Sequence, residues 1–290
     1  GAALGDEAMG GVTAAARRSI SAELLPGWQQ PMPPPAPAAM PPTAREGAAA
    51  VYLPSCINRI FGPAPNGDGR SSLPAALVAV SLRAGSPLWI PAGIAGSCCA
   101  HPWTSKGYVD AAAWMANSTV EELWRWSDGG ELPVVIDATA CVHGLLGAAG
   151  TLSPVNSRHL DAIEVTDSIG WAGRLLPELE IGDRVDRAVI HPTCSSTHLG
   201  LNAELERIAG ELAEEVVVPT HAACCGFAGD RGFLHPELAA SATAEEADEV
   251  TRMDADAHLC ANRTCEIGME RATGERYESF VYLLERLSRP

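Results

Sequence analysis

The chain has 290 residues, of which 47% are hydrophobic and 19% charged, and its formal net charge is −16. This composition is typical of a globular protein with a substantial core and excludes an intrinsically disordered chain. The negative charge argues against a nucleic-acid-binding protein, which needs clustered lysine and arginine. No apolar run reaches the roughly 20 residues of a transmembrane helix.

Residues 1–49 differ in composition from the rest, and they predict a helix followed by a linker. Apolar residues within 14–25 predict the helix, and residues 30–45 are dense in proline. Proline-rich segments favour extended polyproline II structure and act as semi-rigid spacers. The chain begins without Met and without the basic region of a signal peptide. We therefore expect a tether to a domain upstream, in a longer protein.

From residue 50 onward, short apolar runs alternate with helical stretches, which predicts an α/β fold with buried parallel strands. The expected strands are 50–53, 87–91, 133–137, 187–191, 215–219 and 256–259. The expected helices are 74–83, 109–126, 199–214 and 236–253. Similar segments beginning at Asp167 and Glu278 close the two halves. We expect two tandem, similar sheet-and-helix units, 50–180 and 181–290, related by an approximate twofold axis.

Nine cysteines form two matching sets with one left over, and each set reads single cysteine, adjacent pair, single cysteine. The first set is Cys56, Cys98, Cys99 and Cys141, and the second is Cys194, Cys224, Cys225 and Cys265. Each single cysteine or pair follows an expected strand. The thiols should therefore meet at strand C-termini, where open α/β sheets bind their ligands.

Four thiolates in each repeat match the requirement of a [4Fe–4S] cluster, so we expect one or two clusters bound by these eight cysteines. Structural zinc usually takes cysteines two to four residues apart. Adjacent cysteines chelate one ion poorly but can bind different irons of a cluster. Zinc sites and buried or redox-active thiols remain alternatives. Secreted disulfide scaffolds are usually short, so reduced thiols in the cytoplasm are the better interpretation.

Other residues near the two sets are candidates for supporting roles: His101, His143, His191, His221, Arg231, Cys260 and Arg263. The histidines can be ligands, proton donors or hydrogen-bond donors to sulfur, or simply polar residues at strand ends. His143 is the best non-thiol ligand candidate for the first set. The arginines can offset thiolate charge or anchor a buried carboxylate. Cys260 is either a spare ligand or a core thiol.

The cysteine framework resembles the cysteine-rich CCG domain, with the closest motifs at 221–229 and 262–268. That domain occurs in the heterodisulfide reductase B subunit and in iron–sulfur subunits of glycolate oxidase, lactate utilisation and anaerobic glycerol-3-phosphate dehydrogenase. It also forms the C-terminal part of FAD-linked D-lactate dehydrogenases, which this chain resembles most. The resemblance covers about residues 50–290.

This resemblance implies electron transfer within an FAD-dependent D-2-hydroxy-acid dehydrogenase, with D-lactate the first expected substrate and glycolate the second. FAD and a ferredoxin-like module would lie upstream, and a quinone or cytochrome would accept electrons at the inner face of the membrane. The chain alone would then lack dehydrogenase activity. The alternatives are a disulfide or thiol reductase subunit of the heterodisulfide reductase type, and a zinc-bound or metal-free interaction module.

The chain departs from the CCG pattern at two kinds of position. Ala100 stands where glycine should follow the first cysteine pair. The terminal Cys-x-x-Cys has Gly144 in the first repeat and Gly268 in the second, so a fifth thiolate is missing from each. An ordinary cubane and a differently ligated cluster both remain open.

Overall fold

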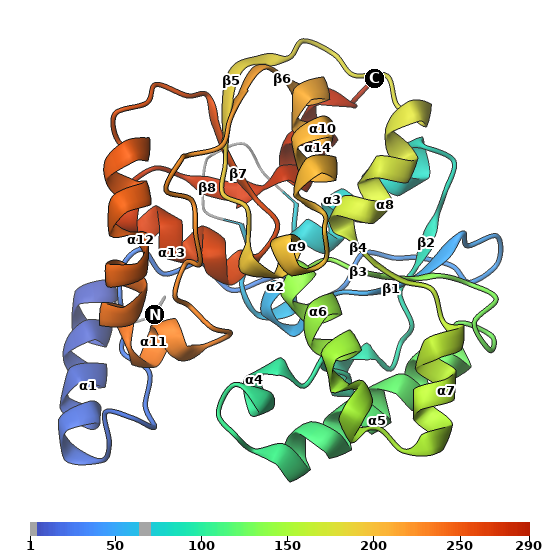
Figure 1. The fold of residues 1–290 in the computed structure, drawn as a ribbon, viewed down its shortest axis with the longest axis horizontal. Helices are drawn as coiled ribbons and strands as arrows, with labels where there is room; N and C mark the ends of the chain where they lie inside the picture. The colour runs from blue at the N-terminus through green and yellow to red at the C-terminus, as the bar shows by residue number, and fades with distance from the viewer. Residues whose placement is uncertain (1–4, 64–70) are drawn as a thin grey trace.

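The computed structural model describes residues 5–63 and 71–290, and its framework is two four-stranded parallel sheets (Figure 1). The first sheet has the order β2-β1-β3-β4, with β1 (Ala50–Leu53), β2 (Leu88–Trp89), β3 (Val134–Ile136) and β4 (Val165–Asp167). The second has the order β6-β5-β7-β8, with β5 (Val185–Ile190), β6 (Ala213–Val217), β7 (Ala257–Cys260) and β8 (Tyr277–Ser279). The predicted α/β class with two similar units is confirmed.

Strands β4 and β8 were not predicted from the sequence. Each lies at the edge of its sheet, where it pairs with a single neighbour. Such edge strands are short and carry polar residues, here Thr166 in β4 and Glu278 in β8, so they lack the apolar run that marks a central strand. The six predicted strands are all present, and β6 begins two residues earlier than expected.

Helices connect the strands of each sheet. Their bounds are α1 Asp6–Ser19, α2 Cys56–Ile60, α3 Leu73–Arg83, α4 His101–Thr104, α5 Val109–Trp126, α6 Thr139–Gly147, α7 Pro154–Ala162, α8 Ser168–Leu175, α9 Cys194–His198, α10 Asn202–Leu212, α11 Arg231–Leu234, α12 Pro236–Val250, α13 Arg263–Thr273 and α14 Phe280–Leu287. Short 3₁₀ turns lie at Ile94–Gly96, Ala148–Thr151 and Leu176–Glu178. Among the residues described, no helix has both the length and the apolar character needed to cross a bilayer.

The two units repeat the same order of elements and pack against each other symmetrically. Helices α2, α3, α6 and α8 of the first unit occupy the places of α9, α10, α13 and α14 in the second. Across the boundary, α3 contacts α14 and α8 contacts α10, while α2 contacts α13 and α6 contacts α9. Each contact therefore occurs twice with the roles of the units exchanged, as an approximate twofold axis requires. Figure 1 shows α6 and α9 meeting between the sheets.

One large hydrophobic cluster contains residues of both units. Strand β1 is wholly buried, and Leu77 of α3 and Leu283 of α14 belong to the same apolar cluster as Leu205 of α10. Burying a leucine side chain stabilises a fold by roughly 1.5–3 kcal/mol. Because the core is shared, the ends of the two sheets are fixed relative to each other, and so are the side chains that they carry.

The N-terminal helix is placed differently from the sequence prediction of 14–25. Helix α1 spans Asp6–Ser19 and ends before Ser21, whose side-chain oxygen accepts hydrogen bonds from the backbone N–H groups of Glu23 and Leu24. Serine side chains that bond to nearby backbone in this way favour turns over helix. Pro26 then follows, and it would not continue a helix.

The segment from Gly27 to Thr43, which includes most of the proline-rich stretch, lies against the body of the protein. Gly27 donates a backbone hydrogen bond to Phe233 at 3.0 Å, and Arg271 of α13 donates to Gln29 at 2.9 Å. Further on, the hydroxyl of Thr43 accepts a hydrogen bond from Ile90 at 2.8 Å. The segment thus crosses from the second unit to the first, and these contacts hold it in place.

Candidate metal centres

The cysteines lie beyond the C-terminal ends of the central strands, in the loops and first helical turns that follow. Cys56 opens α2 after β1, and Cys194 opens α9 after β5. Cys141 lies in the first turn of α6 after β3, as Cys265 does in α13 after β7. Unpaired backbone N–H groups in a first helical turn favour negative charge, so these positions suit thiolates.

The first site brings Cys56, Cys98, Cys99 and Cys141 around one small cavity. Their thiols interact in a chain, from Cys56 to Cys98, on to Cys99 and then to Cys141. The hydrogen bond from Cys56 lowers the pKa of Cys98 and raises the pKa of Cys56 itself. The interaction with Cys56 therefore favours the thiolate form of Cys98.

Two side chains that the sequence did not single out hold the first cysteine pair in place. The hydroxyl of Thr119 on α5 accepts a hydrogen bond from the N–H of Cys98 at 3.1 Å and donates one to its carbonyl at 2.9 Å. Arg59 on α2 donates to the carbonyls of Ile94 and Ser97, both at 2.8 Å. These contacts connect the loop of the pair to the helix that begins at Cys56.

The second site repeats this arrangement with Cys194, Cys224, Cys225 and Cys265. The sulfur atoms of Cys225 and Cys265 lie 3.0 Å apart, and Cys194 interacts with Cys224. As in the first site, a hydrogen bond from the single cysteine lowers the pKa of the first member of the pair, here Cys224. All eight predicted cysteines are thus brought together in two groups of four.

His191 belongs to the second site. One atom each of His191, Cys225 and Cys265 lies within 4.8 Å of the others, and the imidazole is fully buried. Its Nδ1 lies 2.7 Å from Glu246 on α12, which sequence reasoning did not identify because it is far away in the chain. Burial would lower the pKa of His191, but interactions with Cys225 and Glu246 outweigh it and raise the pKa to about 10. Glu246 therefore holds the imidazole in position through Nδ1 and leaves Nε2 on the side of the thiols.

Cys260, which the sequence left unassigned, also lies in the second site. Its side chain is fully buried at the end of β7, and its thiol interacts with that of Cys265. It belongs to a small apolar cluster with Cys225, Cys265 and Phe227. Cys260 is therefore a fifth thiol packed beside the four of the second site.

The remaining histidine candidates lie outside the two groups of thiols. His143 stacks on His198 at 5.1 Å between ring centroids, at the boundary of the units, and it does not line the first cavity. His221 is exposed and contacts Glu249 at 3.0 Å. His101 packs close to Gly144 and Gly229, between the loops that carry the two cysteine pairs.

The two arginine candidates have different surroundings. Arg263 forms a buried ion pair with Glu266 at 2.7 Å and donates to the carbonyl of Gly62 at 2.8 Å. Arg263 thus anchors a carboxylate beside Cys265, one of the two roles considered for it. Arg231 lies on α11 and lines a separate pocket, described below.

Hydroxyl and amide groups connect the two sites across the boundary of the units. Thr139 at the start of α6 lies 3.1 Å from Thr193 and 2.7 Å from Ser195, oxygen to oxygen. Asn262 donates to Ser195 at 3.1 Å and accepts from the N–H of Ala140 at 3.2 Å. Each of these residues lies within three positions of a site cysteine, so this network fixes the sites relative to each other.

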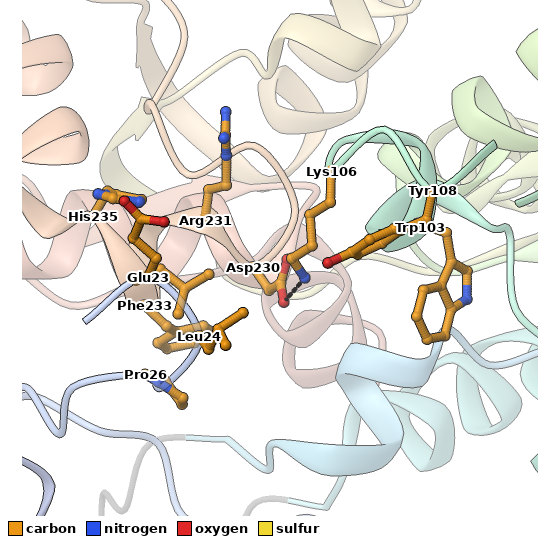
Figure 2. A pocket seen from close by; sticks show the side chains of 11 residues that line it. Glu23, Leu24, Pro26, Trp103, Lys106, Tyr108, Asp230, Arg231, Phe233 and His235 are labelled. Carbon is orange, nitrogen blue, oxygen red and sulfur yellow. Dashed lines mark hydrogen bonds and ion pairs between the residues drawn. The ribbon is translucent and has the colours of Figure 1, made fainter. Parts of the chain in front are cut away.

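A pocket of about 660 Å³ opens between the loops that follow the two cysteine pairs. Figure 2 shows Trp103, Lys106 and Tyr108 on one side, and Asp230 with Arg231 on the other. Lys106, the only lysine in the sequence, forms an ion pair with Asp230. The N-terminal segment contributes Glu23, Leu24 and Pro26. The pocket thus borders both units and the N-terminal segment.

The donor atoms and their surroundings fit iron–sulfur clusters. All the donors brought together in the first site are thiols, and Leu53, Ile136 and Leu145 supply an apolar wall. In the second site, Nε2 of His191 is buried and lacks a hydrogen-bond partner within the described residues. Buried polar atoms normally have partners, so this nitrogen indicates a group that the site can accept. Soft thiolate ligands favour iron–sulfur clusters, zinc and Cu(I).

The ion pair beside Cys265 gives a prediction about stability. Replacing Glu266 with alanine leaves the Arg263 guanidinium buried without its partner, and we expect a loss of about 3–5 kcal/mol in the free energy of unfolding. The double variant Arg263→Met with Glu266→Ala should recover part of that loss, because no buried charge remains. Urea unfolding followed by circular dichroism measures both. Equal stability of Glu266→Ala and the unaltered chain would contradict the prediction.

A comparison with known protein families supports a cysteine-rich site in the second unit. Residues 188–270 match the family model of the cysteine-rich CCG domain. The match runs from β5 to α13 and includes every cysteine of the second set. No curated protein matches the chain. The first unit lies outside the matched range but has the same strand order and cysteine placement. The segment that carries the second site is therefore similar to a cysteine-rich CCG domain, a metal-binding module of oxidoreductase-associated proteins.

Proposed function

We propose that this chain is the iron–sulfur electron-transfer region of an FAD-dependent D-2-hydroxy-acid dehydrogenase. The observation that carries the proposal is the pair of four-thiol sites at equivalent ends of two sheets that share one core. A site that only stabilised the fold would not need to be duplicated in a rigid arrangement. The substrate of the whole enzyme is D-lactate in the first instance, and glycolate in the second.

The proposed ligands are the eight cysteines of the two sets. When bound, an iron–sulfur cluster supplies a one-electron carrier whose potential depends on its charge, burial and hydrogen bonds. At the first site, Leu53 and Ile136 keep water away from the sulfurs. At the second, Glu246 fixes the imidazole of His191 beside Cys225 and Cys265.

In this proposal, the chain works with partners that it does not contain. FAD and a ferredoxin-like module lie upstream in the same protein or complex, and a quinone or cytochrome accepts the electrons. The protein is cytoplasmic and associates with the inner face of the membrane. The pocket bordered by Trp103, Lys106 and Arg231 lies beside both cysteine loops and offers a place where a partner can approach.

The test uses the full-length protein, or this chain in complex with its flavoprotein. After anaerobic mixing with D-lactate, flavin reduction should be followed by an electron paramagnetic resonance signal from reduced clusters. Glycolate in place of D-lactate tests the second substrate. Flavin that is reduced by either hydroxy acid while the clusters stay oxidised would refute the proposed electron-transfer role.

A second candidate is a cluster-based disulfide or thiol reductase. The observation in its favour is that Cys194 and Cys224 are exposed, so a substrate sulfur could reach the second site from solvent. Such a reaction delivers two electrons and two protons to a disulfide and releases two thiols. Dithionite-reduced protein that converts a disulfide to thiols with turnover would favour this candidate. Zinc in place of iron would favour a structural interaction module.

A further inference from the structure

The two sites differ at two structurally equivalent positions. Three residues before the first cysteine, the first unit has Leu53 and the second has His191. Five residues before the last cysteine, the first unit has Ile136 and the second has Cys260. Ile136 and Cys260 each end the strand that pairs with the central strand of their sheet, β3 and β7. The shared strand order therefore allows them to be compared directly.

In the first unit, both of these positions are apolar walls of the site. Leu53 and Ile136 line the cavity around which the four thiols gather. Neither side chain has an atom that can bind a metal. The first site therefore offers four thiols as ligands and an apolar surface between them.

In the second unit, both positions carry atoms that can bind a metal. His191 lies with Cys225 and Cys265 inside 4.8 Å. Cys260 packs in the same buried cluster as Cys225 and Cys265, whose sulfur atoms lie 3.0 Å apart. Within the described residues, the hydrogen bond that Cys260 makes is a long one, 3.7 Å from sulfur to the carbonyl of Asn262. The side chain is fully buried, so its thiol cannot turn to solvent.

We propose that Cys260 is a fifth thiolate ligand of the group held in the second site, so that the two sites hold chemically different groups. This inference rests on the proposed function, because it requires a cluster at the second site. A fifth thiolate adds one negative charge beside the cluster. Greater negative charge lowers a reduction potential. The second site should therefore have the lower potential of the two.

The experiment compares two reciprocal substitutions in anaerobically purified protein. Cys260→Ile makes the second site resemble the first, and Ile136→Cys does the reverse. Cys260→Ile is combined with Cys99→Ser, which disables the first site and leaves the second as the only source of signal. Leu259→Ile, on the opposite face of the same strand, is the matched control. The measurements are iron and sulfide per chain, the electron paramagnetic resonance spectrum and the midpoint potential.

We expect Cys260→Ile to change the g values and raise the midpoint potential of the second site, or to remove its iron altogether. Ile136→Cys should lower the potential of the first site. An unchanged spectrum, potential and iron content in Cys260→Ile would overturn the inference while the proposed function stands. An unaltered chain without iron at the second site would instead refute the proposed function. If Cys260→Ile does not fold, the nearly isosteric Cys260→Ser provides the same test.

Discussion

Protein in which Cys225 is replaced by serine will hold about half of the iron bound by the unaltered chain, a fall from about eight atoms to about four. Cys225 is buried, contacts Cys265 at 3.0 Å and interacts with Cys224 and His191, so it is central to the second site. Serine supplies a hard oxygen in place of a soft thiolate and does not replace it as a ligand. Cys99→Ser should have the same effect on the first site, and the double variant should hold no iron.

The control for this prediction is Ala223→Ser, which adds a hydroxyl to an exposed position directly before the pair. It should retain all of the iron. Iron and acid-labile sulfide are measured per chain after anaerobic purification, and the spectra of the two single variants should add up to that of the unaltered protein. Full iron content in both single variants would contradict the assignment of these cysteines as ligands.

Replacing Asp137 with alanine is expected to destabilise the fold by about 2–5 kcal/mol. The carboxylate is buried just after β3, where it accepts hydrogen bonds from the Tyr52 hydroxyl at 2.6 Å and the Ser55 backbone N–H at 2.8 Å. Both donors are buried and would lose their partner in the variant. Because Ser55 directly precedes Cys56, the first site should also lose iron, while the second site keeps its own. The equivalent position in the second unit is Ala261, so no such support exists there.

Two further variants separate the hydrogen bonds from the charge. Tyr52→Phe removes one donor only and should lower the free energy of unfolding by about 1 kcal/mol.

Burial raises the pKa of Asp137, so the folded protein binds the carboxyl proton of Asp137 more tightly than the unfolded chain does. From this group alone, stability falls as the pH rises from about 4, the unfolded pKa, through the folded pKa. Asp137→Asn should remove that part of the pH dependence. Urea unfolding at several pH values measures it, and an Asp137→Ala variant as stable as the unaltered chain would refute the role of this carboxylate.

The repeated architecture could be predicted from the sequence because the central strands are buried on both faces. The residues of β1 and β3, for example, are continuous apolar runs bounded by turn residues. The edge strands β4 and β8 could not be found in this way, because partial exposure or hydrogen bonding allows polar residues there. The predicted position of the N-terminal helix was also wrong. The turn at Ser21 depends on local hydrogen bonds to its side chain, which compete with helix formation.

The eight cysteines could be grouped from the sequence because the two sets follow equivalent strands. The difference between the sites could not, because it depends on contacts between distant elements. Glu246 reaches His191 only because α12 packs beside the end of β5. In the sequence, Cys260 looks like an ordinary strand residue. In the structure it is the last residue of β7, and it packs in the same buried cluster as Cys265. Comparing the two units position by position, Ile136 against Cys260, is the signal that could have found it.

The most direct test is the content of iron, acid-labile sulfide and zinc per chain in anaerobically purified protein. Two thiolate-bound clusters predict about eight irons with matching sulfide and no zinc. Because the sites share one core and one hydroxyl network, both clusters should survive gel filtration together. Stoichiometric zinc, or protein free of metal that takes up no iron and sulfide on reconstitution, would contradict an electron-transfer function for this chain.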